Sequence, residues 1–232
     1  MQMITAIESQ KRNPRRVNIY LDGEFAFGLS KVAAAWLKVG QTLDEEKITS
    51  LKNNDQRDAI YQQALHFLSY RSRSAAEVRR NLNKRNLPEE LIEATLERLQ
   101  QNGLVNDTAF TRAWIENRSE FHPRSKSALR LELRRKGIDD ETILSALSEG
   151  TDEEKLALDA ARKYLHKLMV REERGGDKLE IAGFREKMSG YLSRRGFAYS
   201  TIAMVVTKIW QELRQMADSS ENTDNEENYE SN

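Results

Sequence analysis

Cysteine is absent from this 232-residue chain, so disulfides and thiolate–metal sites are excluded. Proline occurs three times and glycine 11 times, which disfavours a sandwich of many strands joined by frequent turns. No run of about 18 apolar residues is present, and the first residues lack the apolar stretch of a secretion signal. We therefore expect a cytoplasmic protein that does not associate with membranes.

Charged residues are abundant instead, at 32% of the sequence against 38% hydrophobic residues, a balance that suits helical units with small cores. The zero net charge hides an uneven distribution, because no Lys or Arg follows Arg214. Outside the acidic C-terminal segment the chain has 37 basic and 31 acidic residues. This excess of positive charge suits a partner that carries phosphates. We expect residues 215–232 to form a disordered acidic tail, with Asp218, Glu221, Asp224, Glu226, Glu227 and Glu230.

The N-terminal 55 residues carry the strand signals. Two runs of β-forming residues, 17–21 and 24–27, flank Asp22-Gly23, a dipeptide typical of a two-residue hairpin turn. Residues 3–7 can add a third strand. Ser30 is placed to cap a short helix that runs through Trp36, and Asp44 is placed to cap a second helix.

From about residue 56 to 213 the hydrophobic period is 3.6, which predicts helices throughout. Ser74 and Glu77 have capping-box spacing, and Pro88 fits the first turn of a helix that Gly103 would end. Further N-caps are predicted at Asp107, Asp139 and Ser200.

A repeat organises this helical region. Three 19-residue segments, starting at Val78, Leu129 and Met188, align without gaps. In each, two cations precede Asn or Gly, a residue type that tolerates the left-handed conformation at a helix end. These triplets are Lys84-Arg85-Asn86, Arg135-Lys136-Gly137 and Arg194-Arg195-Gly196. At five aligned positions, here called the apolar columns, all three segments have an apolar residue: Val78, Leu129 and Met188; Leu82, Leu133 and Leu192; Leu87, Ile138 and Phe197; Ile92, Ile143 and Ile202; Leu96, Leu147 and Val206.

With one preceding helix per segment, at 57–70, 107–120 and 153–170, the pattern predicts a mainly α protein of three tandem three-helix repeats. We expect these repeats to form an elongated, curved array, since each buries little alone. The expected domains are an N-terminal β-hairpin and short helices at 1–55, repeats at 56–106, 107–150 and 151–214, and the tail at 215–232. The third repeat contains an insertion at 170–177.

Cations concentrate in the middle of the first two repeats, whereas acids follow them. Solvated helix faces that complement helix dipoles would explain any single one of these residues. The whole set also suits a surface that contacts several phosphates, or an acidic protein surface.

No other constellation indicates chemistry. His66, His122 and His166 are dispersed without metal-ligand spacing, so we expect neither metal nor cofactor nor catalysis. Gly175-Gly176 lacks the Lys-Ser/Thr of a phosphate loop, and turn chemistry explains Asp22 next to Glu24. The large aromatic residues are expected in cores, with base stacking as the alternative: Phe67, Phe110, Trp114, Trp36 and Trp210.

The repeats resemble the RecX family of recombination regulators. The resemblance rests on 64–79 followed by Leu82, on 103–107 with Phe110, on 131–138 and on 194–197, in register with the repeat. It covers about residues 56–213, and the hairpin region is similar to the N-terminal extension of longer members. Asn86 replaces a usual Gly, and Asn106-Asp107 stands where paired acids are commoner.

The resemblance implies a protein that lodges in the groove of the RecA–single-stranded DNA filament and lowers its ATPase and strand-exchange activities. We hypothesise that twelve cations face filament DNA or an acidic RecA surface, and that the acidic helix starts then meet basic protein surface. These cations are Arg71, Arg73, Arg79, Arg80, Lys84, Arg85, Arg130, Arg134, Arg135, Lys136, Arg194 and Arg195.

Two other functions are compatible with the pattern. A sequence-independent DNA-binding helical protein would bind naked DNA tightly, whereas a filament regulator should bind it weakly. A helical adaptor that binds only proteins would be insensitive to salt and would not crosslink to DNA. We expect a monomer, because no long heptad pattern is present.

Overall fold

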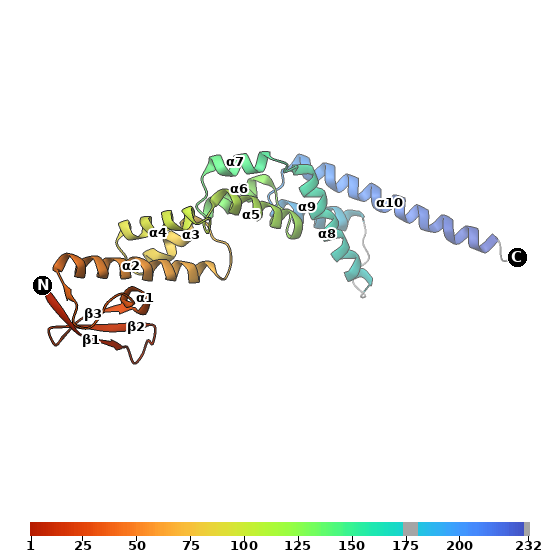
Figure 1. Ribbon diagram of the computed structural model, residues 1–232. Helices are drawn as coiled ribbons and strands as arrows, with labels where there is room; N and C mark the ends of the chain where they lie inside the picture. Colours follow the sequence, from red (N-terminus) through yellow and green to blue (C-terminus); the bar gives the residue numbers. More distant parts are fainter. Residues whose placement is uncertain (174–180, 230–232) are drawn as a thin grey trace. The chain divides into compact units, whose positions relative to one another are not determined.

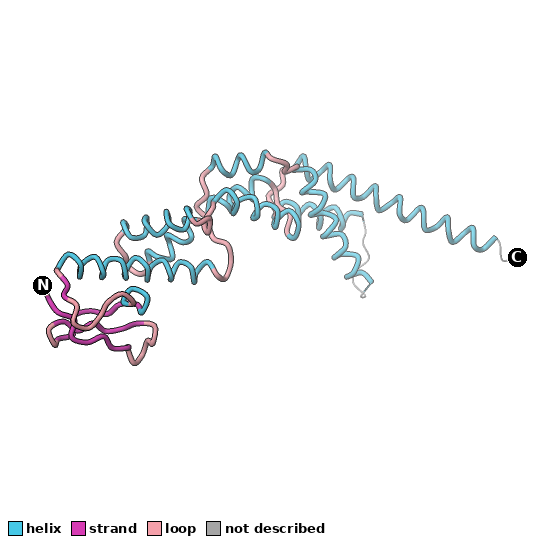
Figure 2. Tube along the Cα trace, viewed as in Figure 1, coloured by secondary structure: helices cyan, strands magenta, loops and turns pink. Residues whose placement is uncertain are grey.

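The structure is a computed structural model that describes the backbone of residues 1–173 and 181–229 and the side chains of residues 1–170 and 183–215. The chain divides into two compact units, Met1–Val105 and Asn106–Asn232. Strands occur only before residue 44 in the described part, and helices make up most of the remainder (Figure 2). The predicted mainly α fold is confirmed.

A four-stranded antiparallel sheet begins the first unit (Figure 1). It consists of β1 (Gln2–Ser9), β2 (Arg16–Leu21), β3 (Glu24–Ser30) and β4 (Thr42–Leu43), in the order β3-β2-β1-β4. Asp22 and Gly23 adopt φ values of 51° and 92°, as a tight hairpin turn requires. The predicted hairpin and third strand are confirmed. The sequence did not predict β4, because two residues are too few to show an alternation of apolar and polar side chains.

One face of this sheet is buried beneath α1 (Lys31–Ala34), capped by Ser30, and the start of α2 (Glu45–Leu68), capped by Asp44. Ile4, Ile19 and Leu29 are fully enclosed in this core. Asp55 of α2 fastens the sheet, because its carboxylate accepts hydrogen bonds from the Ser30 amide and the Arg16 guanidinium, both at 2.7 Å. Both partners lie where β2 and β3 pair, so the hairpin and α2 share one buried polar contact.

The helix after Ser30 is shorter than predicted and ends at Ala34 instead of continuing through Trp36. The prediction that Trp36 belongs to a core is wrong, because 88% of this residue is exposed. Ala34 and Leu37 supply the inward contacts of the segment, so Trp36 is left on its outer side.

The first three-helix repeat consists of the second half of α2, α3 (Ala75–Asn83) and α4 (Glu89–Gln101). The helix expected at 57–70 is the end of α2, which begins at Glu45 because no Gly or Pro interrupts residues 45–68. Phe67 packs against this core as expected.

The second unit contains six helices in its described part, which share one hydrophobic core. They are α5 (Asp107–Phe121), α6 (Lys126–Arg135), α7 (Asp140–Ser148), α8 (Glu153–Glu173), α9 (Ile181–Arg194) and α10 (Tyr199–Tyr229). Phe110 is buried, and Trp114 and Trp210 pack against this core, as predicted. The insertion lies largely outside the described residues. The acidic segment has helical backbone as far as Tyr229, and its side chains beyond Gln215 lie outside the described part.

The apolar columns of the repeat are confirmed. Fourteen of the fifteen residues are buried, and Leu87 is partly buried against the first-repeat core. Most of the predicted helix ends are also correct. Ser74 and Glu77 form the complete capping box, and Asp139 caps α7.

Three helix starts differ by one or two residues from the sequence prediction. Asn106 rather than Asp107 caps α5, because its extended backbone lets its side chain accept from the Ala109 amide. Pro88 occupies the N-cap of α4 instead of its first turn. Ser200 is not a cap, because α10 begins at Tyr199 and the Ile202 amide already donates to the Ala198 carbonyl.

Candidate functional site

The turn between the second and third helices has the same construction in all three repeats. Asn86, Gly137 and Gly196 adopt left-handed φ values of 53°, 82° and 87°. The amides of these three residues donate to carbonyls three residues earlier, Asn83, Arg134 and Ser193, at 3.1, 2.9 and 2.9 Å. The cations before these residues therefore lie at the carboxyl end of α3, α6 or α9, where the helix dipole favours positive charge.

In the first repeat, several predicted site residues are engaged within the chain. Arg79 pairs with Glu89, at 2.8 Å, and with Glu93, both near the start of α4. Arg71 pairs with Glu77 at 2.9 Å, and the guanidinium of Arg73 lies 4.3 Å from the centre of the Phe67 ring.

The other three cations of this repeat are exposed. Arg80 donates to the Ala76 carbonyl of its own helix at 3.2 Å. Lys84 and Arg85 follow the last residue of α3 and form no ion pair with any described residue. Their charges are therefore available to an external anion.

The second repeat repeats this arrangement. Arg130 and Arg134 of α6 both donate to Asp140 in the first turn of α7, with Nε–Oδ1 distances of 3.1 and 2.7 Å. Arg135 is exposed at the end of α6, and Lys136 lies 4.8 Å from the centre of the Trp114 ring. Acids at the start of the third helix thus neutralise part of the cationic surface in the first two repeats.

In the third repeat this neutralisation is missing from the described contacts, because α10 starts with Tyr-Ser-Thr and supplies no carboxylate. Arg194 is exposed without an ion pair to any described residue. Arg195 is held in place, since it donates to the Pro123 carbonyl at 2.9 Å and lies 4.6 Å from the centre of the Tyr191 ring.

One cluster in the second unit was not predicted from the sequence. Glu132 of α6 accepts from the indole of Trp114 at 3.0 Å and from Arg118 at 2.9 Å, and it pairs with Arg124 at 3.1 Å. The alternation of charge along α6 gave no sign that one acid would bind three residues of another segment. These contacts engage both oxygens of Glu132, and the one from the indole fixes Trp114 against the core.

The Asp140 carboxylate is the group whose ionisation these contacts change most. Hydrogen bonds from Arg134 and then Arg130 stabilise its charged form and lower its pKa far below the ordinary value. Its contribution to stability is therefore complete above the unfolded-state pKa of about 4 and is lost as the pH falls toward the folded-state pKa.

We accordingly expect Asp140→Asn to destabilise the second unit at pH 7 and to cost progressively less as the pH is lowered below about 4. Urea unfolding of the wild-type chain and of Asp140→Asn across this pH range measures the difference in their free energies of unfolding. Glu141→Gln is the matched control, because it removes the same charge from the neighbouring exposed position. A difference in free energy of unfolding that stays constant with pH would contradict the role assigned to the Arg134–Asp140 pair.

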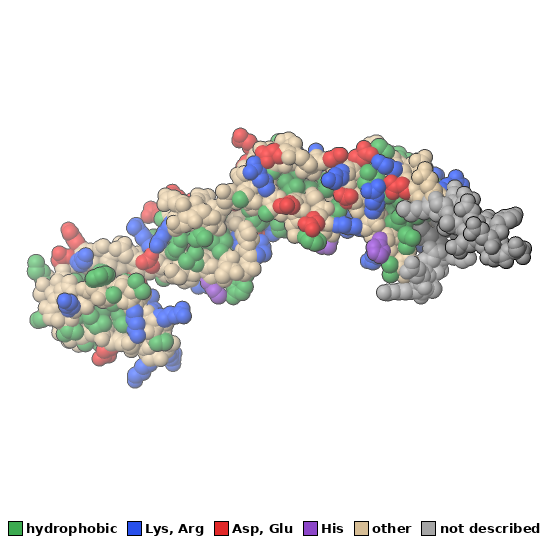
Figure 3. Space-filling model, turned by 45° about the vertical axis from the view of Figure 1, so that its right-hand side comes forward, with side chains coloured by type: hydrophobic (Ala, Val, Ile, Leu, Met, Phe, Trp, Pro, Cys, Tyr) green, Lys and Arg blue, Asp and Glu red, His purple; other side chains and the backbone are tan. Residues whose placement is uncertain are grey.

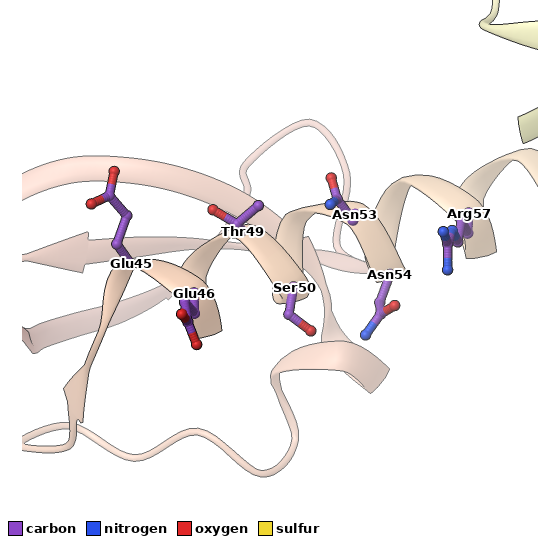
Figure 4. Close-up of a pocket in the computed structure, with 7 residues that line it drawn as sticks. All are labelled: Glu45, Glu46, Thr49, Ser50, Asn53, Asn54 and Arg57. Atoms are coloured by element: carbon purple, nitrogen blue, oxygen red, sulfur yellow. The ribbon is translucent and has the colours of Figure 1, made fainter. Parts of the chain in front are cut away.

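The surface hollows of the described part include one on α2. The one in Figure 4 is lined by side chains of α2 alone, which lie along one side of that helix: Glu45, Glu46, Thr49, Ser50, Asn53, Asn54 and Arg57. Among described residues, no group of three or more His, Asp or Glu side chains is placed to hold a metal ion. None of the described helices is long and apolar enough to span a bilayer.

These features define a class of tandem three-helix repeat proteins, each repeat with a cationic turn, preceded by a small β unit. Family models match three segments between residues 2 and 147: "Regulatory protein RecX N-terminal domain" at residues 2–44, "RecX, first three-helix domain" at 61–99 and "RecX, second three-helix domain" at 106–147. The chain belongs to the RecX family of regulatory proteins.

Individual relatives agree with this assignment. Regulatory protein RecX of Bacillus pumilus is 36% identical over 204 residues, which cover 87% of this chain and 75% of that protein. Its counterpart in Bacillus subtilis is 32% identical over 211 residues, covering 90% and 78%. A crystal structure of regulatory protein RecX superimposes with a TM-score of 0.62 at 29% identity, covering 88% of this chain and 98% of that one.

Proposed function

We propose that this chain regulates homologous recombination and DNA repair by binding in the groove of the RecA–single-stranded DNA filament. It inhibits or modulates RecA ATPase, strand exchange and filament growth as a monomer in the cytoplasm, through binding and without catalysis of its own. The observation that carries this proposal is the cationic turn in each repeat, with exposed charges at Lys84, Arg85, Arg135 and Arg194. Membership of the RecX family supports RecA as the proposed partner.

The proposed contact surface comprises the twelve cations predicted from the sequence, which divide into two groups. Lys84 and Arg85, directly after α3, and Arg194, the last residue of α9, are exposed and would meet phosphates or acidic RecA side chains directly. Arginines such as Arg79 and Arg134 are bound to the chain's own carboxylates and contribute a weaker net field. The acids Glu89, Glu93 and Asp140 are held by these arginines, so the proposed contact of acidic helix starts with a basic partner surface does not include them.

A RecA ATPase assay on single-stranded DNA, with this chain titrated in, tests the proposal. We expect inhibition at concentrations well below coverage of the DNA, and we expect inhibition to weaken between about 50 and 200 mM salt because phosphate contacts release counterions. Tight binding to naked DNA together with unchanged RecA turnover would favour the sequence-independent DNA-binding alternative instead.

A further inference from the structure

The N-terminal unit presents an apolar row to solvent. Val32 and Trp36 are one helical turn apart on α1 and the turn that follows it, and they are 82% and 88% exposed. Val39 follows at 63%. Ala34 and Leu37 already fill the inward side, so the row is not needed for the N-terminal core. Adjoining exposed apolar side chains, unlike a single one, are typical of an interaction site.

Cations gather at the same end of the sheet. The loop between β1 and β2 and the start of α1 meet there, because β2 pairs antiparallel with both neighbours and the Lys31 amide donates to the Arg15 carbonyl at 2.9 Å. Figure 3 shows Lys and Arg side chains collected over one end of the N-terminal sheet. The exposed cations of this end are Lys11, Arg12, Arg15 and Lys31, and a further exposed cation, Lys38, follows Trp36 by two residues.

Acids are scarce around this row. The acids nearest in sequence are Glu8, at the end of β1, and two groups at the opposite end of the sheet: Asp22 and Glu24 in the hairpin turn, and Asp44, Glu45 and Glu46 after β4. Asp55 of α2 is already occupied by Arg16 and the Ser30 amide. The end of the sheet formed by the 10–15 loop and the start of α1, from which Trp36 follows, therefore has a local excess of positive charge that the zero net charge of the chain conceals.

We propose that the surface formed by Trp36, Lys31, Lys38 and the 10–15 loop is a second nucleic-acid site, one that binds a single strand. A flat exposed indole offers a stacking platform for a base, and the flanking cations match its phosphates. A duplex keeps its base faces stacked inside, so it cannot use the indole in this way. An acidic peptide would satisfy the cations and leave the indole without a partner. This site is separate from the cationic turns of the repeats.

Titration of the full chain with a fluorescein-labelled oligothymidine of about 15 nucleotides, followed by anisotropy at low salt, tests this site. We expect Trp36→Ala to weaken binding roughly tenfold and Trp36→Phe to retain most of it, since either ring can stack. Lys31→Glu with Lys38→Glu should weaken binding and flatten its salt dependence.

Phe25→Ala is the matched control, because Phe25 is a 59% exposed aromatic residue at the opposite turn of the same sheet. It should leave binding unchanged. An unaltered thermal midpoint of Trp36→Ala would show that the variant is folded. Equal oligothymidine affinity of Trp36→Ala and the wild-type chain would overturn the proposal. So would Trp36-dependent binding of a labelled peptide with the sequence of residues 215–232 in place of the oligonucleotide.

The same variant separates this site from the proposed RecA regulation. Trp36→Ala should lose affinity for the free oligonucleotide and still inhibit RecA ATPase through the repeats. If both activities disappear together in a folded variant, the idea of two independent sites is wrong. If wild-type chain binds oligothymidine without affecting RecA, the regulatory proposal fails and this site stands.

Discussion

Replacing Lys84, Arg85 and Arg194 together with glutamate should abolish inhibition of RecA ATPase at concentrations where the wild-type chain inhibits fully. The three reversals place negative charge at the turns of the first and third repeats. Each lost phosphate contact removes one released counterion, so affinity should fall by orders of magnitude and the residual salt dependence should flatten. RecA turnover on single-stranded DNA measures the effect, with circular dichroism to confirm unchanged helicity.

These positions suit the experiment because none forms an ion pair with a described residue, so reversal leaves no carboxylate without its partner. Reversing Arg134 instead would set a glutamate against Asp140 and confuse loss of binding with loss of stability. Lys47→Glu, Arg57→Glu and Lys163→Glu form the matched control, since they change the net charge equally at exposed positions outside the proposed surface. Full inhibition by the Lys84, Arg85 and Arg194 variant would remove the cationic turns from the regulatory surface.

Gly196→Ala should lower the free energy of unfolding of the second unit by about 2–4 kcal/mol. Two separate costs combine. The φ of +87° is unfavourable for any residue with a Cβ, and a Cβ at this point would lie 2.7 Å from the Ser125 hydroxyl and 3.1 Å from the Ala128 Cβ. The turn of the third repeat therefore packs directly on the start of α6, where the Ser125 amide also donates to the Arg195 carbonyl at 3.2 Å.

Gly103→Ala separates these two costs. Its φ of +67° is also left-handed, but nothing lies within 4 Å of the added Cβ, so we expect a loss of about 1 kcal/mol. Urea unfolding of both variants measures the difference. Equal losses would show that the contact between the Gly196 turn and α6 adjusts without cost, contrary to the close packing described here.

The repeat could be predicted from the sequence because its signals are local. The spacing of Leu82, Leu133 and Leu192 from their neighbours fixes a helix face, and two cations before Asn86, Gly137 or Gly196 fix a helix end, whatever the rest of the chain does. The Asp22-Gly23 hairpin is equally local. Helix starts were less certain, since adjacent Asn106 and Asp107 are both able to cap and only backbone geometry selects one.

The exposure of Trp36 could not be predicted from the sequence. The hydrophobicity of a side chain indicates that burial is favourable, but it does not indicate whether the folded core has space for that side chain. The sheet core was already filled by Ile4, Ile19 and Leu29 together with the inward side of the α1 segment. Asp55 is the opposite case, a charged residue that is buried. The sequence predicts a solvated carboxylate in the middle of α2, and only the folded hairpin places the Ser30 amide and the Arg16 guanidinium next to it.

The sequence by itself determined the helical repeat, its turns and the sign of the charge at each turn. Each of these features is encoded by residues close together in the chain, within one helix and the turn that follows it. Only the tertiary structure decided which cations remain available. Arg79 and Arg134 meet carboxylates across a turn, whereas Lys84, Arg85 and Arg194 do not. Ion pairing depends on distances between side chains of different helices, and those distances exist only once the helices have packed.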